Sequence, residues 1–267
     1  MGKNSNNVKV IYDFGCNNGI DIPYFLRKGD KLVVVDANPA HINEIKSVYR
    51  EHIDRGVLVA IDNIITTQES GERLDFFLHK KHNVRSTMVR PQDQEIHDFE
   101  VIKIKTKNAL EIIQEHGLPY YVKTDLEGYD EMLLEYLLKN NIRPSFISAE
   151  MNNINIFSLL HSIGGYQYFN IVDGSNVHID YKTCRIQTNN GVEEFSFKEH
   201  SAGPFGNDIS TKWMNADNII RRIAMEKYGW KDLHATNERI ERGIDVFRMK
   251  RCIFKKIIER FTFGLIR

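Results

Sequence analysis

Apolar and polar positions follow two alternating patterns along the first 150 residues, and this alternation predicts an α/β fold. Short runs of β-branched and aromatic residues, typical of buried strands, are separated by segments whose apolar residues recur at helical spacing. The strand-like runs cover residues 8–12, 32–35, 57–61, 120–124 and 145–149. Strands that alternate with helices are typical of a mostly parallel, doubly wound sheet with helices on both faces.

The pattern changes between residues 72 and 105. Residues 72–78 resemble a short strand, and strict alternation over 99–105 predicts a strand with one buried face. The intervening segment is polar and basic and contains His79 and His82. Long polar connections inside compact domains are uncommon unless they serve as binding loops or lids. This loop suits an anionic or hydroxyl-rich substrate, and a solvated surface loop is the alternative.

An acidic residue follows or closes every strand of the main series. These residues are Asp13, Asp36, Asp62, Asp125 and Glu150. In open α/β sheets, ligands bind in the crevice beyond the carboxyl ends of the strands. The recurrence of carboxylates at that position therefore favours an enzyme.

The turn after the first strand, from Asp13 to Gly19, has the properties of a nucleoside-binding loop. Gly15 and Gly19 lack a Cβ, so a ligand can approach the backbone closely. The spacing G-x-x-x-G departs from the G-x-G-x-x-G of dinucleotide folds. Because Asp13 precedes the loop, a ligand with a cationic amino acid end is favoured over a diphosphate, and S-adenosylmethionine is such a ligand. Asp36 can accept both ribose hydroxyls. A purely structural glycine turn is the alternative.

Three more acids are candidate binding or catalytic residues, namely Asp62, Asp125 and Glu127. Asp62 can accept the adenine amino group, or it can be an ordinary turn acid. Asp125 and Glu127 end a strand and open an apolar helix, so they can orient a hydroxyl, act as a base or hold a cation, or merely cap the helix. His82 is a further candidate base. The sequence offers oxygen ligands but no complete set, so we predict no metal site; a divalent metal is compatible with it.

The composition disfavours several classes of protein, namely nucleic-acid-binding, disulfide-rich secreted and membrane-spanning proteins. The chain has 267 residues with 36 basic and 36 acidic ones, and a zero net charge supplies no general attraction to nucleic acid. Its three cysteines are scattered without metal-ligand or disulfide spacing, which favours a reducing, cytoplasmic compartment. The N-terminus lacks a signal-peptide pattern, and no apolar run is long enough to span a bilayer.

Three stretches together resemble the FkbM family of S-adenosylmethionine-dependent methyltransferases. They are the glycine turn, Val35-Asp36-Ala37-Asn38-Pro39, and Val122-Lys123-Thr124-Asp125-Leu126-Glu127-Gly128-Tyr129-Asp130. The resemblance implies a Rossmann-like class I methyltransferase fold with a substrate loop insertion and a C-terminal helical extension. It also implies O-methyl transfer to a hydroxyl of a sugar or glycan precursor, as in polysaccharide or natural-product biosynthesis.

The resemblance, together with the histidine of the polar loop, gives the predicted site residues. Asp125, Glu127 and His82 are the predicted catalytic residues. The predicted cofactor-binding residues are Asp13, Gly15, Asn17, Gly19, Asp36, Ala37, Asp62 and Asp125.

The last third of the chain is harder to interpret. We expect residues 1–200 to form the methyltransferase domain and residues 201–267 to add a loop and a helical extension on or beside it. Residues 242–267 are basic and amphipathic, a pattern that fits the inner face of a membrane as well as packing or an oligomer contact. We favour packing or an oligomer contact.

Two other classes of protein remain open at this point. One is an NAD- or nucleotide-dependent sugar-modifying enzyme with a Rossmann sheet, which the glycine spacing disfavours. The other is a non-catalytic scaffold with a methyltransferase fold, which the intact set of acids disfavours.

Overall fold

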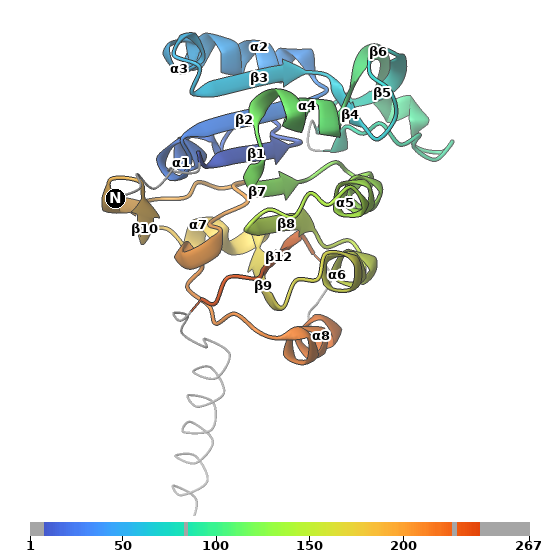
Figure 1. Ribbon diagram of the computed structural model, residues 1–267. Coiled ribbons are helices and arrows are strands. Elements are labelled where there is room, and N and C mark those ends of the chain that lie inside the picture. Colours follow the sequence, from blue (N-terminus) through green and yellow to red (C-terminus); the bar gives the residue numbers. More distant parts are fainter. Residues whose placement is uncertain (1–7, 83–84, 226–228, 241–267) are drawn as a thin grey trace, which may run out of the picture.

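A seven-stranded sheet forms the centre of the computed structural model, which describes residues 8–82, 85–225 and 229–240 (Figure 1). Its strand order is β3-β2-β1-β7-β8-β12-β9. The strands are β1 (Val10–Phe14), β2 (Lys31–Asp36), β3 (Leu58–Asp62), β7 (Pro119–Thr124), β8 (Phe146–Glu150), β9 (Tyr168–Asp173) and β12 (Lys231–Thr236). The five predicted strands that end in acids lie side by side, so the predicted α/β fold class is confirmed.

One strand of this sheet runs against its neighbours. β12 lies between β8 and β9 and is antiparallel to both, whereas β3, β2, β1, β7 and β8 pair in parallel. The arrangement extends the dinucleotide-fold order 3-2-1-4-5-6 by one reversed strand inserted before the last. Residues 231–236, which lie beyond the predicted boundary at residue 200, form an interior strand of the same sheet.

Helices cover both faces of the sheet and bury its apolar side chains. One face packs against α4 (Ala109–His116), α5 (Asp130–Lys139), α6 (Asn155–Ser158) and α8 (Ala216–Met225). The other packs against α1 (Ile22–Lys28), α2 (Pro39–Val48) and α7 (Val177–Asp180), with α3 (Arg50–Asp54) following α2. Short helical turns complete the list: η2 (Ile96–Asp98), η3 (Leu159–Ile163), η4 (Gly174–Asn176) and η5 (Gly206–Asp208).

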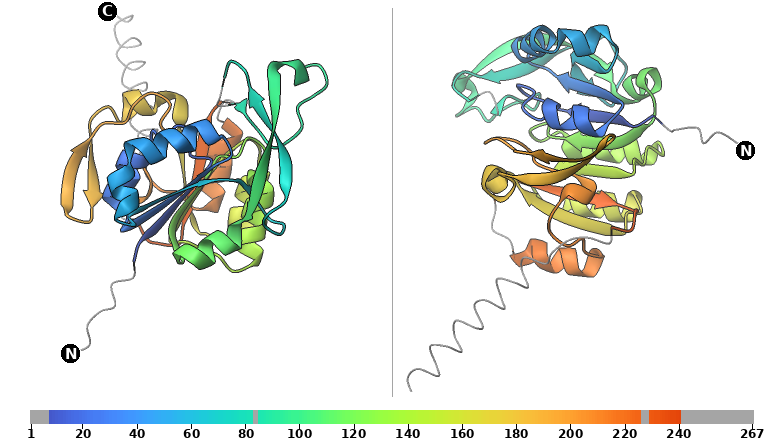
Figure 2. Two further views of the ribbon diagram at one scale, coloured as in Figure 1. Left: turned by 90° about the horizontal axis from the view of Figure 1, so that it is seen from above. Right: turned by 90° about the vertical axis from the view of Figure 1, so that its left-hand side faces the viewer.

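Three strands form a second sheet beside the edge strand β3. They are β4 (Ile64–Thr66), β5 (Arg73–His79) and β6 (Phe99–Asn108), and β6 pairs in parallel with β4 and antiparallel with β5. Figure 2 shows this sheet on one side of the molecule and the hairpin of β10 (Cys184–Thr188) and β11 (Gly191–Phe195) on the opposite side. The long polar segment predicted as a substrate loop connects β5 to β6.

Asn108 caps α4 by accepting hydrogen bonds from the N–H groups of Leu110 and Glu111. Met132 of α5 is 55% exposed.

The segment from residue 201 to 208 is part of the core. The sequence predicted a loop that either closes over substrate or turns the chain. Phe205 is instead buried, and its ring stacks on that of Tyr121 at a centroid separation of 3.9 Å. This packing joins the segment to the face of the sheet below the strand ends.

No helix within the described ranges is long and apolar enough to cross a membrane. The basic stretch over 242–267, for which packing or a membrane contact was considered, lies outside the described residues.

Candidate active site

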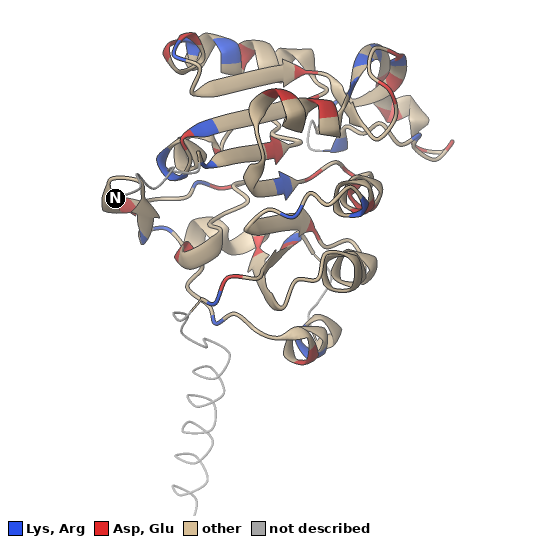
Figure 3. Cartoon of the chain, viewed as in Figure 1, with Lys and Arg blue, Asp and Glu red and all other residues tan. Residues whose placement is uncertain are grey.

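The carboxyl ends of the parallel strands meet at one edge of the sheet and bring most of the predicted site residues together. Acidic residues stand where the arrows of β1 and β3 end in Figure 3. Asp13 lies near the end of β1, Asp36 ends β2, and Asp125 directly follows β7. Glu150 ends β8, which lies beside β7.

The glycine turn after β1 presses against the turn after β7. Gly15 has a φ of +85°, and a Cβ placed on it would lie 1.9 Å from the backbone oxygen of Asp125. Gly19 has a φ of +73°, and its missing Cβ leaves room for the side chains of Ile22 and Ile45. Both glycines are therefore required, for the left-handed backbone and for the close approach.

Asp36 is held rigidly beside this turn. One carboxylate oxygen accepts the N–H of Asn17 at 2.8 Å and the other accepts the N–H of Asn38 at 2.8 Å. Ala37, between them in the sequence, packs at the edge of the core formed by the small sheet. A carboxylate has about four acceptor positions, so Asp36 keeps capacity to bind two hydroxyls.

Asp62 lies directly beside Asp36 in the pairing of β2 with β3. Its side chain is half exposed, and its nearest cation is the Lys46 ammonium at 3.8 Å. The register agrees with the predicted position at the same edge; the role in binding adenine remains a prediction.

A buried lysine connects the ends of β1 and β7. The Nζ of Lys123 lies 3.4 Å from Oδ1 of Asp13 and 3.4 Å from Oδ2 of Asp125. Burial by itself would lower the pKa of Lys123, but four carboxylates, those of Asp13, Asp125, Asp232 and Asp21, together outweigh it and hold the pKa well above its usual value. Burial raises the pKa of Asp13 to about 6, against the opposing effect of Lys123.

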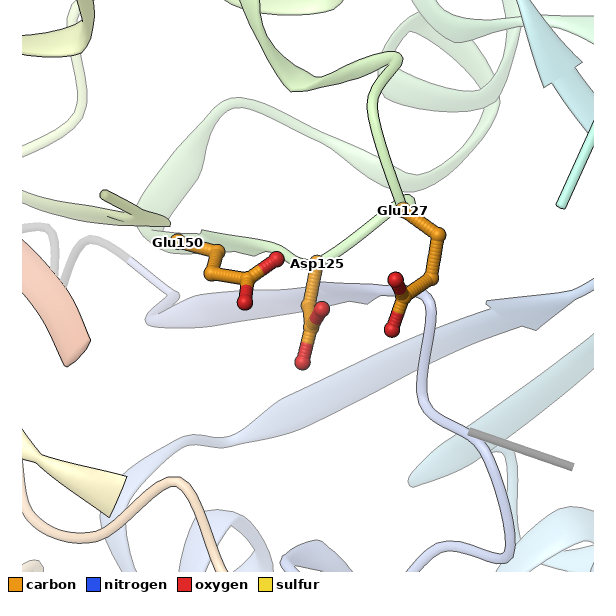
Figure 4. Close-up of side chains that lie close together, drawn as sticks. All are labelled: Asp125, Glu127 and Glu150. Carbon is orange, nitrogen blue, oxygen red and sulfur yellow. The ribbon is translucent and has the colours of Figure 1, made fainter. Parts of the chain in front are cut away.

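Three carboxylates converge just outside this ion pair. Figure 4 shows the side chains of Asp125, Glu127 and Glu150 directed toward a common space, and oxygens of the three lie within 4.8 Å of one another. Burial of the carboxyl group and the neighbouring Asp125 raise the pKa of Glu127 to about 8. The same two causes raise the pKa of Glu150 to about 7. At neutral pH this cluster therefore retains protons that ordinary carboxylates have lost.

Sequence reasoning missed the polar side chains that β12 brings to the site. Asp232 faces Glu150 across the antiparallel pairing, and His234 faces Ser148. Burial lowers the pKa of His234 to about 3, so its ring is neutral. Alternation of these two polar residues with Leu233 and Ala235 is a strand pattern, and it was the signal available in the sequence.

Asp21, just before α1, is a second residue that the sequence did not single out. It is buried and accepts hydrogen bonds from the Ser201 hydroxyl and from the N–H of Ala202. Its carboxylate thereby ties the 201–208 segment to the glycine turn.

His82 does not join the acidic cluster. Its ring is exposed and lies 5.2 Å from the ring of His79, and no hydrogen bond or ion pair within the described residues links it to Asp125 or Glu127. The polar loop instead approaches the site through Thr87, whose hydroxyl donates to the backbone oxygen of Glu127 at 2.9 Å. A catalytic role for His82 remains a prediction without a supporting contact.

Comparison with known proteins adds structural neighbours only. No protein-family model matches the chain, and no curated protein sequence matches it. A methyltransferase FkbM from Methylobacillus flagellatus KT is 10% identical, with a TM-score of 0.41 over 65% of this chain, and the chain spans 42% of that protein. The C-terminal domain of precorrin-6Y C5,15-methyltransferase from Rhodobacter capsulatus is 10% identical, with a TM-score of 0.37 over 87% of this chain and 82% of its own. An O-methyltransferase from Bacillus cereus in complex with SAH is 9% identical, with a TM-score of 0.35 over 86% of this chain and 76% of that protein.

The described sheet is mostly parallel with helices on both faces, in agreement with the Rossmann-like fold that the sequence resemblance implies, and one of its seven strands, β12, is reversed. Similarity this low does not transfer a substrate or a reaction from one protein to another, so the function has to be argued from this chain's own residues.

The close approach at Gly15 predicts the effect of adding one methyl group. Gly15→Ala is expected to destabilise the protein by clearly more than Gly56→Ala, measured as the free energy of unfolding in urea. Both positions have a positive φ, which costs about 1 to 2 kcal/mol for a residue with a Cβ, but nothing lies within 4 Å of a Cβ at Gly56. Equal losses in the two variants would contradict the packing of the two turns.

The raised pKa values predict how stability depends on pH. An acid whose pKa is higher in the folded than in the unfolded state binds more protons when folded, so stability falls as pH rises between the two values. Stability should therefore decrease from about pH 4.5, the usual value, through about 7 for Glu150 and about 8 for Glu127. Urea unfolding in a chelating buffer at several pH values measures this slope. The slope should become shallower in a Glu127→Gln, Glu150→Gln double variant, and an unchanged slope would count against the cluster.

Proposed function

We propose that this protein is an S-adenosylmethionine-dependent methyltransferase that transfers a methyl group to a hydroxyl of a sugar or glycan precursor. The observation that carries the proposal is the packing of the Gly15 turn against Asp125, with Asp36 on one side and the pair of Asp13 and Lys123 on the other. This arrangement supports the assignment of nucleoside binding and of reactive carboxylates to one edge of the sheet.

The charge of the edge favours a cationic cofactor. S-adenosylmethionine carries a sulfonium and an ammonium group, and both would lie near carboxylates in a cofactor that extends from Asp36 toward Asp13 and Asp125. A dinucleotide would instead bring a pyrophosphate toward the same acids, where like charges repel. Asp36 is assigned to the ribose hydroxyls and the more exposed Asp62 to the adenine amino group. Gly15, Asn17, Gly19 and Ala37 are assigned to the walls of the cofactor site.

The acceptor is assigned to the space in front of Asp125, Glu127 and Glu150. Methyl transfer needs the acceptor oxygen in line with the methyl carbon and the sulfur, so positioning supplies much of the acceleration. The oxygen–carbon bond forms as the carbon–sulfur bond breaks, the sulfur keeps the electron pair, and a carboxylate takes the hydroxyl proton. Glu127 is the preferred base because its pKa of about 8 makes its deprotonated form, which predominates above pH 8, a better proton acceptor than an ordinary carboxylate.

A titration with two cofactors tests the cofactor assignment. By calorimetry, S-adenosylmethionine should bind, and Asp36→Asn should weaken its binding about tenfold or more, a loss of about 1.4 kcal/mol. Asp75→Asn serves as a control, because Asp75 lies on β5 and pairs with Lys103 at 2.7 Å, outside the site. Binding of NAD in place of S-adenosylmethionine would instead favour the nucleotide-dependent sugar-modifying enzyme.

An activity assay tests the reaction. Incubation with a labelled methyl donor and a panel of cell-envelope or capsule sugar extracts should label an acceptor. Glu127→Gln should lower kcat by about 10²-fold or more while leaving the affinity for the cofactor nearly unchanged, because the base acts only in the transfer step. Full turnover in that variant would remove Glu127 from the chemistry. A chain that binds the cofactor but labels no acceptor would point toward the non-catalytic scaffold.

A further inference from the structure

We propose that Asp125, Glu127 and Glu150 bind a divalent cation of the Mg²⁺ or Mn²⁺ type, with remaining positions left for water and the acceptor oxygen. The sequence alone predicted no metal site, because it did not show that the end of β8 supplies a third carboxylate beside the first two. The metal site stands on the geometry of these residues, and only the part played by the acceptor oxygen rests on the proposed function.

The spacing of the three carboxylates fits a single ion. Their oxygens lie within 4.8 Å of one another. Oxygens on opposite sides of a Mg²⁺ or Ca²⁺ ion are about 4 to 5 Å apart, twice the usual metal–oxygen distance. An all-carboxylate set selects hard cations over zinc, which takes cysteine and histidine more readily. The three residues come from two neighbouring strand ends, so only small movements of their side chains are needed.

A buried carboxylate beside the cluster gives an independent indication of a missing ligand. Asp232 is 2% exposed, and its Oδ1 has no hydrogen-bond partner among the described residues. Asp232 pairs with Glu150 in the sheet and therefore projects on the same face, toward the cluster. Buried polar atoms without partners are rare in proteins and often mark a water or an ion. A water bound to the proposed ion would donate the hydrogen bond that Asp232 lacks.

The excess of negative charge at this edge of the sheet also favours the binding of a cation. Lys123 forms ion pairs with Asp13 and Asp125, and no ion pair within the described residues joins it to Glu127 or Glu150. The carboxylates around Lys123 therefore outnumber the cations that the contacts place among them. The like charges of the cluster repel one another. An ion of charge +2 would offset that repulsion.

The ion would act on the acceptor rather than on the cofactor. A hydroxyl coordinated to a divalent ion has a lowered pKa and a fixed orientation. Each carboxylate has two oxygens, so Glu127 can coordinate through one and take the hydroxyl proton on the other. The methyl group then moves from sulfur to oxygen as described above, and the ion undergoes no redox change.

Binding of Mn²⁺ alone to the full chain tests the site. The signal of free Mn²⁺ in electron paramagnetic resonance falls as the ion binds, which gives its affinity without any assay of activity. Wild-type protein should bind one Mn²⁺, and Glu127→Gln and Glu150→Gln should each weaken that binding about tenfold or more. Glu135→Gln is the matched control, because Glu135 is an exposed glutamate of α5 paired with Lys139 and should leave the affinity unchanged.

Several results would overturn the proposal. They are the absence of Mn²⁺ binding at millimolar concentration, and wild-type affinity in both Glu127→Gln and Glu150→Gln. Urea unfolding of each variant establishes that it is folded, and Glu127→Gln alone tests the site if Glu150→Gln does not fold. Binding of S-adenosylmethionine to the metal-free chain is measured separately. Cofactor binding without Mn²⁺ binding refutes the metal site alone, whereas Mn²⁺ binding without cofactor binding refutes the proposed function alone.

Discussion

The contact on which the rest of the site depends is the buried ammonium of Lys123 between the carboxylates of Asp13 and Asp125. A buried charge is tolerated only when it is paired, and removing one partner from such a pair is strongly destabilising, by about 3 to 5 kcal/mol. Lys123 therefore holds the ends of β1 and β7 at a fixed separation. That separation lets the Gly15 backbone touch the backbone oxygen of Asp125, so the glycine turn and the acidic turn form one surface.

This surface is negative because the sheet collects its acids at one edge. Each parallel strand contributes a carboxylate at its end. Because the strands are adjacent, these carboxylates lie close together and repel one another. Ordinary carboxylates would be fully ionised at neutral pH, whereas burial and repulsion keep part of this set protonated. A site of this kind is stabilised by positively charged ligands. The sulfonium cofactor and the divalent ion proposed above are two such ligands, and they would occupy different parts of the edge.

The reversed strand β12 changes what the central sheet can do. In an ordinary parallel sheet the strand beyond β8 would end at the same edge as the others. Here the strand begins at that edge, so Asp232 at its start faces Glu150 and His234 lies one step deeper, opposite Ser148. The side chains that β12 presents on this face of the sheet, near the candidate acceptor space, are thus polar. On the other face, Leu233 and Ala235 of the same strand join the apolar core.

The amino-acid sequence by itself determined the parallel part of the sheet, the glycine turn and the acids at the strand ends. These features depend on neighbouring residues: β-branched runs form strands, Gly15 takes a positive φ, and Asp36 follows its strand directly. Only the tertiary structure decided that Glu150 joins Asp125 and Glu127, that Lys123 bridges two strands, and that residues 231–236 lie inside the sheet. The tertiary structure also separated His82 from the acids, although the basic, histidine-containing composition of its loop had suggested a catalytic role. The physical reason is that each of these facts depends on which strands pair and in which direction, and strand pairing brings together residues as far apart as 150 and 232 through contacts that no local pattern encodes.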